Sequence, residues 1–408
     1  MKQHSRMIGG ILLVSGTTIG AGMLALPVST GMSGFLPSLL LLVLYWIFMT
    51  YTAFLMLEVN LWMGENNNLI SMAKHTLGKW GQVISWVVYL FLLYSLTTAY
   101  IAGGSPIVID ALTAISRVTL PEWAGTIPLL GIFGYFVYKG THSVDRVNRL
   151  LMVGLVIAYG FLVVFLTPNV KASFLLHTDW KYLMMGVSVV AISFGFHIII
   201  PSLVSYLDRD IAKLKKVILI GSIIPLILYI SWEFLTLGIL PIKGEHGIFE
   251  GYLNGSNGAH LLGEMLGNTA IAMVARFFSF FAIITSFLGV SLSLSDFLAD
   301  GLKIKKNRSG RFLIFVLTFL PPLVVTLMDP RAFLSALEYA GAFGVVMLLG
   351  LFPGLMAWSG RYRKHLATAA DYQVAGGKGA LLLVILISLA VIILEAAIKI
   401  RLIAWIPD

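Results

Sequence analysis

The sequence predicts an all-α integral membrane protein, built from two inverted five-span repeats and one additional span. Three observations support this fold class. The 408 residues are 58% hydrophobic and only 12% charged, whereas soluble domains carry about 25% charged residues. Apolar runs long enough to cross a membrane recur along the chain. Two of these runs, the first and the sixth, are interrupted near their middle by glycine.

Eleven spans are expected, with boundaries correct to within a few residues. They lie at about 8–29, 35–62, 81–104, 124–139, 147–167, 180–205, 216–240, 268–299, 311–328, 332–357 and 379–400. Repeat one then covers about 8–167, repeat two about 180–357, and the last span at about 379–400 lies outside both. The loops are too short for a soluble domain, so residues 1–408 are expected to form one transmembrane domain.

The distribution of basic residues predicts the orientation. Most of the 28 Lys and Arg residues fall in the amino-terminal tail and in the loops that share its side of the membrane. Cytoplasmic loops are enriched in Lys and Arg, so the N-terminus is expected inside the cell and the C-terminus outside. The same enrichment explains the net charge of +9. The expected partner is therefore the lipid bilayer and not nucleic acid.

Several function classes are disfavoured. The chain has no cysteine, which excludes disulfides and thiolate metal sites. Its eight histidines are scattered without metal-ligand spacing, so neither an enzyme nor a resident cofactor is expected. A channel is a less favoured alternative, because no repeated filter-like loop is present. A solute carrier is the favoured class.

The first span contains SGTTIGAGMLALP, Ser15 to Pro27, in which Gly16, Gly20 and Gly22 fall within seven residues. One interpretation is close helix packing through a small-xxx-small contact. The favoured interpretation is a helix that unwinds near the membrane midplane and exposes backbone amides and carbonyls to a bound solute. That interpretation predicts a second broken span in the other half of the chain.

The sixth span supplies the second break. It contains SVVAISFGFHIIIPSL, with Gly195 in its middle and Pro201 six residues later. In the first span, Pro27 follows Gly20 by a similar interval. The two breaks are five spans apart. Because five is an odd number, the chain crosses the membrane in opposite directions at the two breaks, and the two halves have opposite orientations. Paired breaks of this kind are typical of carriers built from inverted repeats.

The motif GTTIGAGMLALP resembles the first-span signature of the hydroxy and aromatic amino acid permeases, within the amino acid–polyamine–organocation superfamily. SFGFH in span six and TSFLGVSLSLSDFLADG in span eight are similar to that family as well. The resemblance covers nearly the whole chain. It implies a LeuT-type fold and the import of tyrosine or tryptophan by cation symport across a bacterial inner membrane. Transport of another neutral amino acid in the same fold is the alternative.

Unwinding of the first span places the amides of Gly20, Ala21 and Gly22 at the start of a half-helix. That end of a helix carries partial positive charge and suits the carboxylate of an amino acid. Glycine lets the backbone approach a ligand closely. These three residues are therefore the predicted carboxylate site.

In the sixth span, the carbonyls from about Val190 to Ser193, next to the break at Gly195, are expected to be free and to suit the ammonium group. Phe196 is a candidate for the wall of the side-chain pocket, with core packing as the alternative. Tyr94 in span three is a weaker pocket candidate.

The coupling ion is left open between sodium and a proton. In span eight, Thr285 and Ser286 follow Ala282 by one helical turn, which resembles the sodium site of LeuT-type carriers. The matching carbonyls in the first span belong to Gly16 and Ile19, and oxygen ligands suit a hard cation. Alternatively, the two hydroxyls bond to their own helix. The resemblance itself favours protons.

Three further residues are candidates for proton transfer or gating. The reference pKa of histidine lies near neutrality, so His197 could carry a proton, or it could be held by a hydrogen bond to backbone. Glu338 could belong to an outer gate. Asp300 could form an inner gate with Lys2 or Arg6, with a solvated surface aspartate as the alternative.

Two charges lie inside predicted spans and need partners. Glu233 and Arg276 each lie about 12 Å from the outer ends of their spans, at 1.5 Å per residue. A lone charge in the bilayer is costly, so the two side chains could pair with each other, with a water-facing position for either as the alternative.

Overall fold

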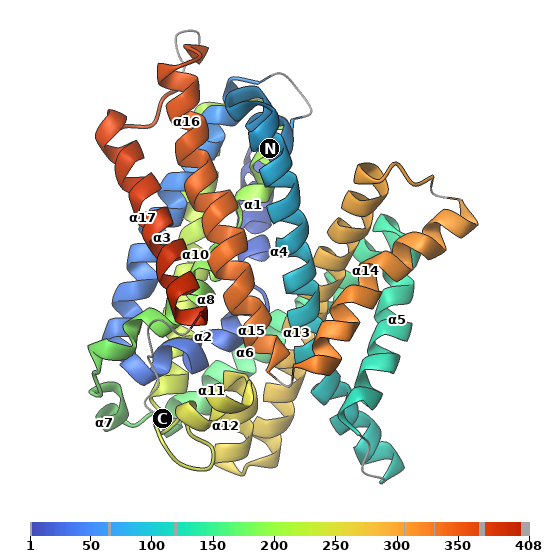
Figure 1. Ribbon diagram of the computed structural model, residues 1–408. Helices are drawn as coiled ribbons and strands as arrows, with labels where there is room; N and C mark the ends of the chain where they lie inside the picture. Colours follow the sequence, from blue (N-terminus) through green and yellow to red (C-terminus); the bar gives the residue numbers. More distant parts are fainter. Residues whose placement is uncertain are drawn as a thin grey trace.

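The protein is a bundle of long helices (Figure 1). The computed structural model describes residues 2–63, 67–117, 121–305, 307–329, 331–366 and 372–400. Within these ranges no residue lies in a β-strand. Nine helices there are long and apolar enough to cross a membrane, or ten if one sharply bent pair counts as a single span. The chain is therefore a multi-pass helical membrane protein.

The helices that correspond to the predicted spans occur in the expected order. Their bounds are α1 Lys2–Thr18 with α2 Gly22–Thr30, α3 Phe35–Leu61, α4 Leu69–Ser116, α5 Thr126–Lys139, α6 Thr141–Leu166, α8 Val187–Ser193 with α9 Ile200–Tyr206, α10 Ile211–Leu237, α13 Thr269–Gly301, α14 Arg308–Met328, α15 Ala332–Tyr339 continued by a π-helical stretch Ala340–Leu351 and α16 Phe352–Tyr362, and α17 Gly377–Lys399. Short helices fill the loops: α7 Ala172–Leu175, α11 Ile248–Asn254 and α12 Gly258–Leu266.

Most predicted boundaries agree with these helices to within a few residues, and the third span differs most. Helix α4 extends beyond the predicted 81–104 at both ends, and its amino-terminal segment turns at Gly78, where φ is 81°. Glycine adopts this left-handed geometry without a Cβ penalty. The fourth span lies where it was predicted, but α5 has only 14 residues, fewer than the about 20 that usually cross a membrane.

Both predicted breaks are present. The first span stops at Thr18 and resumes at Gly22, and its two arms are bent by 52°. The sixth stops at Ser193 and passes through three non-helical residues, Phe194–Phe196. It resumes through the 3₁₀ turn His197–Ile199 and α9. In the described ranges, only the first pair is bent by more than 40°.

The two ends of the bundle differ. The short helices α11 and α12 cover one end, at the bottom of Figure 1, where both pack against α2. We call this the α11–α12 end. The carboxyl end of α16 lies at the opposite end.

The sides of the bundle present apolar surface. In α6, Leu150 and Val156 have exposed fractions of 74% and 68%. Large apolar side chains in contact with water are unfavourable, whereas lipid tails accept them. The exposed faces of these helices therefore suit a bilayer.

Candidate functional site

The two breaks lie against each other in the middle of the bundle. Helix α2 packs on α8, and a Cβ at Gly22 would be 3.1 Å from the hydroxyl oxygen of Ser193. Gly22 opens α2 and Ser193 closes α8. The start of one half-helix therefore meets the end of the other, which brings backbone donors and acceptors to one place.

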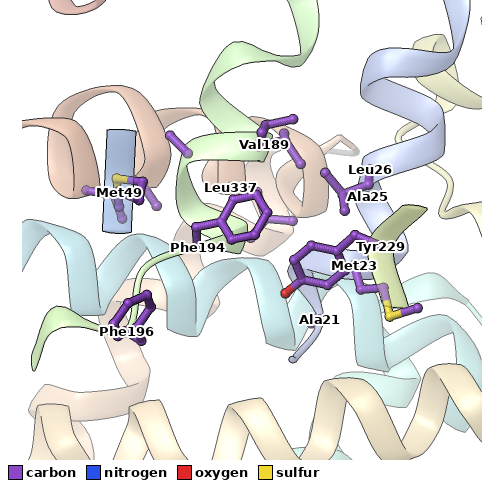
Figure 2. Packing of buried hydrophobic residues seen from close by; sticks show 14 of the residues in the cluster. Ala21, Met23, Ala25, Leu26, Met49, Val189, Phe194, Phe196, Tyr229 and Leu337 are labelled. Atoms are coloured by element: carbon purple, nitrogen blue, oxygen red, sulfur yellow. The ribbon is translucent and has the colours of Figure 1, made fainter. Parts of the chain in front are cut away.

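Tyr229 on α10 joins the carboxyl ends of both broken helices. Its hydroxyl donates to the carbonyl oxygens of Thr18, at 2.7 Å, and Ser193, at 2.9 Å. Thr18 is the last residue of α1, and Ser193 is the last of α8. The Tyr229 ring is fully buried and meets Phe194 edge to face at 5.4 Å. Figure 2 shows both rings beside the break, which Ala21 marks.

Sequence analysis missed Tyr229. The available signal was a single phenol within the apolar run LILYISW of span seven, because buried tyrosine hydroxyls usually have a hydrogen-bond partner.

The amide side of the site centres on Ser286. The Ala21 amide donates to the Ser286 hydroxyl oxygen at 3.1 Å, and a Cβ at Gly20 would be 2.6 Å from the same oxygen. Any larger residue at Gly20 would force the serine to move. Tyr100 of α4 forms a side-chain hydrogen bond with Ser286. The predicted carboxylate site is therefore bordered by two hydroxyls, of which Tyr100 was not anticipated.

The sixth span departs from the prediction of free carbonyls. The amides of Phe194 and Gly195 donate to the carbonyls of Ala191 and Ile192, and the Ser193 carbonyl accepts from Tyr229. In this structure these three carbonyls therefore each accept one hydrogen bond from the protein, because the chain turns back on itself at the break, and each keeps a second lone pair.

The remaining sixth-span candidates are buried at the break. Val190 and Phe196 have no exposed surface. A Cβ at Gly195 would be 3.1 Å from the Ile192 carbonyl oxygen and 3.5 Å from the Leu349 side chain. The tight turn therefore needs a small residue at that position.

The Tyr94 side chain contacts α14 and not the breaks. Its hydroxyl donates to the Leu317 carbonyl of α14 at 2.8 Å, so it ties α4 to α14. Tyr100, six residues further along α4, is the tyrosine that reaches Ser286. A difference of six residues places the two side chains on different faces of one helix.

Among the candidate ion ligands, Thr285 is bonded to its own helix in this structure. Its hydroxyl donates to the carbonyls of Phe281, at 2.7 Å, and Ala282, at 3.2 Å, which is the alternative arrangement. Gly16 lies in the last turn of α1, and Ile19 is the first residue after that helix. The described part of the chain holds no group of three or more His, Asp or Glu suited to a metal ion.

His197 is held by its neighbours. It is fully buried at the start of the 3₁₀ turn that follows the break. Its Nε2 lies 2.9 Å from the Thr52 hydroxyl oxygen, and it also bonds to the backbone of Met49. These contacts match the structural alternative stated for this histidine.

The gating candidates differ in their surroundings. Glu338 is buried, accepts from the Tyr252 hydroxyl of α11 at 3.0 Å and pairs with Lys399 at the end of α17. Asp300 is exposed at the end of α13. Its proposed partner Arg6 instead pairs with Asp208 at 2.6 Å, because Asp208 follows α9, which packs beside α1. The side chain of Lys2 lies outside the described residues.

The pairing of Glu233 with Arg276 is wrong. Glu233 is fully buried and accepts from the Thr30 hydroxyl at 3.0 Å. Arg276 pairs with Asp110 of α4, with 3.5 Å between Nε and Oδ2. Equal depth in two helices does not bring side chains together when their faces point to different neighbours.

These features define a class of protein. The chain is a multi-pass bundle with two interrupted helices in contact, and hydroxyls of neighbouring helices hold the exposed backbone. Interrupted spans of this kind form the solute sites of membrane carriers. The fold and the site are therefore those of a membrane transporter.

Comparison with known proteins specifies the family. Residues 3–395 match the tryptophan/tyrosine permease family. A tyrosine-specific transport system 2 of Haemophilus influenzae is 34% identical over 97% of both chains. A tryptophan-specific transport protein of the same organism is 34% identical over 92% of both, and one of Pseudomonas aeruginosa is 31% identical over 100% of this chain and 97% of its own. The chain belongs to the tryptophan/tyrosine permease family, which consists of transporters and not enzymes.

Proposed function

We propose that this protein imports an aromatic amino acid, tyrosine or tryptophan, across a bacterial inner membrane by cation symport. The family and the substrates named for its relatives support the substrate class. The observation that carries the mechanism is the contact between the two broken helices, which is held by Tyr229 and Ser286. This contact supports a site at which helix-start amides and helix-end carbonyls together bind one small zwitterion.

The substrate carboxylate binds at the amides of Gly20, Ala21 and Gly22. The start of α2 lies beside them, and its dipole favours negative charge. The hydroxyl of Ser286, which now accepts from Ala21, can rotate to donate to the carboxylate.

The substrate ammonium binds at the carbonyls that end α1 and α8. A carbonyl oxygen has two lone pairs, so Thr18 and Ser193 can accept from the ammonium while Tyr229 continues to orient them. The aromatic side chain then packs near Phe194 and Phe196, both buried at the break. Packing against other rings favours an aromatic substrate.

For the coupling cation, two arrangements remain. Sodium would take the carbonyls of Gly16, Ile19 and Ala282 with the hydroxyls of Thr285 and Ser286, after Thr285 turns away from its own helix. A proton would need none of these ligands. Neither cation requires a resident cofactor.

We further propose a LeuT-type arrangement of two inverted repeats, about 8–167 and about 180–357, with α17 added. The N-terminus lies in the cytoplasm, the C-terminus lies outside, and the α11–α12 end faces outward, as the distribution of Lys and Arg predicts. The contacts of Glu338 then belong to an outer gate, and Asp300 forms the inner gate in another conformation of the carrier.

Uptake into proteoliposomes tests the function. Purified protein should accumulate labelled tyrosine or tryptophan with saturation, and other aromatic amino acids should compete while leucine should not. Sodium and pH gradients imposed independently would identify the coupling ion. Equal competition by leucine would favour the alternative of a general neutral amino acid carrier, and the absence of saturable uptake would exclude the proposal.

A further inference from the structure

A hollow lies between the breaks and the α11–α12 end. This vestibule is a cavity of about 530 Å³ bordered by α4, α13 and the loop before α12. Its volume lies within the range typical of small-molecule sites, about 300–1,000 Å³. Its lining includes one arginine, Arg276, with an aspartate opposite, Asp110, and two large aromatic residues, Trp123 and Phe333.

The two charges are paired weakly and remain open to water. Arg276 and Asp110 approach at 3.5 Å through one nitrogen, and their side chains are 58% and 40% exposed. Exposed ion pairs of this kind contribute little free energy, and a guanidinium has further N–H donors. An amino acid zwitterion can therefore insert between them at small cost, with its carboxylate on Arg276 and its ammonium on Asp110.

Two other ionisable groups of the vestibule have partners of their own. Asp329 accepts from the Arg331 amide at 2.8 Å, and His260 lies 3.2 Å from Glu264. Of the two aspartates in the lining, Asp110 is the one that pairs with Arg276.

The aromatic walls suit the rest of the substrate. Trp123 is 54% exposed at the rim, and Phe333 is buried at the floor. An indole or phenol ring gains by packing against such surfaces.

The vestibule is aligned with the breaks by two packed helices. On α4, Asp110, Gly103 and Tyr100 are spaced by seven and three residues, which places them along one face. On α13, Arg276, Ile283 and Ser286 follow the same spacing. Helices α4 and α13 pack against each other. Asp110 therefore lies about 15 Å along the helix from Tyr100, at 1.5 Å per residue.

The floor is a tight seal above the breaks. A Cβ at Gly103 would be 2.6 Å from the Phe333 ring and 3.2 Å from Ile283. One turn beyond it, Tyr100 and Ser286 share their hydrogen bond at the first break. Movement of the Phe333 ring would open a direct route between the two sites.

We propose that the vestibule is a separate recognition site for zwitterionic aromatic amino acids. Arg276 binds the carboxylate, Asp110 binds the ammonium, and the substrate then passes Phe333 to reach the breaks. This inference rests on the proposed transport function and adds a site that precedes the one at the breaks.

Uptake kinetics in proteoliposomes test the site. Arg276→Gln and Asp110→Asn should each raise the KM for labelled tyrosine or tryptophan about tenfold, on the scale of one charge-assisted hydrogen bond. Vmax should stay within about twofold, because the breaks are unchanged. The matched control is Arg149→Gln, which removes an exposed arginine from its pair with Asp145 on α6 and should leave KM unchanged.

Two further variants separate recognition from structure. The exchange Arg276→Asp with Asp110→Arg restores an ion pair but reverses its charges, so KM should remain high if the pair binds substrate. Arg276→Lys keeps the charge and should recover most of the lost affinity. Recovery of wild-type KM in the exchange variant would show that the pair is only structural and would overturn the site.

The same assay distinguishes failure of this site from failure of the proposed function. Saturable uptake by the wild type, with KM values in Arg276→Gln and Asp110→Asn equal to the control, would overturn the vestibule site alone. No saturable uptake of any aromatic amino acid by the wild type would overturn the proposed function and the vestibule site with it.

Discussion

Removal of one hydroxyl at the centre of the bundle should uncouple the two broken helices. In Tyr229→Phe the ring keeps its edge-to-face contact with Phe194, but the carbonyls of Thr18 and Ser193 lose their shared donor. A buried polar group without its partner costs about 1–3 kcal/mol. This free-energy cost applies only to conformations in which the ends of α1 and α8 are held together. Because those conformations bind substrate, affinity should fall by about 5- to 150-fold.

Tyr159→Phe is the matched control. Tyr159 on α6 also bonds to α10, at the Leu228 carbonyl and the Ser231 hydroxyl, away from the ends of α1 and α8. Both variants lose one hydrogen-bonded phenol hydroxyl, so both should show a modest loss of thermal stability. Only Tyr229→Phe should impair saturation binding and uptake of labelled tryptophan or tyrosine. If both variants bind substrate within about twofold of the wild type, the account of Tyr229 is wrong.

Three further predictions concern the surroundings of the site. Ser286→Ala removes the acceptor of the Ala21 amide and should weaken substrate binding about tenfold, on the scale of one hydrogen bond. Unchanged substrate affinity in a binding titration would count against the proposed carboxylate site. Thr285→Val nearly preserves the shape of the side chain and removes one oxygen, so the apparent sodium affinity should fall several-fold if sodium is the coupling ion. Uptake that does not depend on sodium at a fixed pH gradient would exclude sodium as the coupling ion. Glu338→Gln weakens the links of α15 to α11 and α17 and should increase labelling, from the α11–α12 end, of a single cysteine introduced at Ala102, which lines the cavity between α4 and α13; labelling equal to that of the parent would remove Glu338 from the outer gate.

Much of the fold could be predicted from local pattern. Long apolar runs located the helices, because the membrane requires about 20 apolar residues for each span. The breaks could be predicted because Gly20 and Gly195 fall in the middle of such runs, where glycine is unfavourable unless the backbone needs it. The third span was the difficult case, since α4 extends beyond the predicted 81–104 at both ends.

The partners of individual side chains could not be predicted in the same way. Span positions give the depth of a residue but not the direction of its face, and so Glu233 and Arg276 were paired wrongly. In the structure, Arg276 forms an ion pair with Asp110, and Glu233 accepts a hydrogen bond from Thr30. These choices depend on how each helix is rotated, which is set by packing with neighbours and not by the local sequence.

Polar side chains from neighbouring helices were missed for the same reason. Tyr100 and Tyr94 lie on one span, and only the structure shows that Tyr100 reaches the break. Tyr229 lies in a third helix, far in sequence from both breaks that it joins. These two hydrogen bonds connect residues 211 and 36 positions apart, beyond any local pattern.

The most direct test of the central claim is substrate binding to purified protein with a bulky residue at the first break. A Cβ at Gly20 would already lie 2.6 Å from Ser286, whereas one at Gly160 on α6 would have no neighbour within 4 Å. We predict that Gly160→Leu binds labelled tryptophan or tyrosine like the wild type, and that Gly20→Leu, folded by size-exclusion chromatography, does not bind. Equal binding by the two variants would contradict the claim that the substrate carboxylate lies against the backbone of the first break.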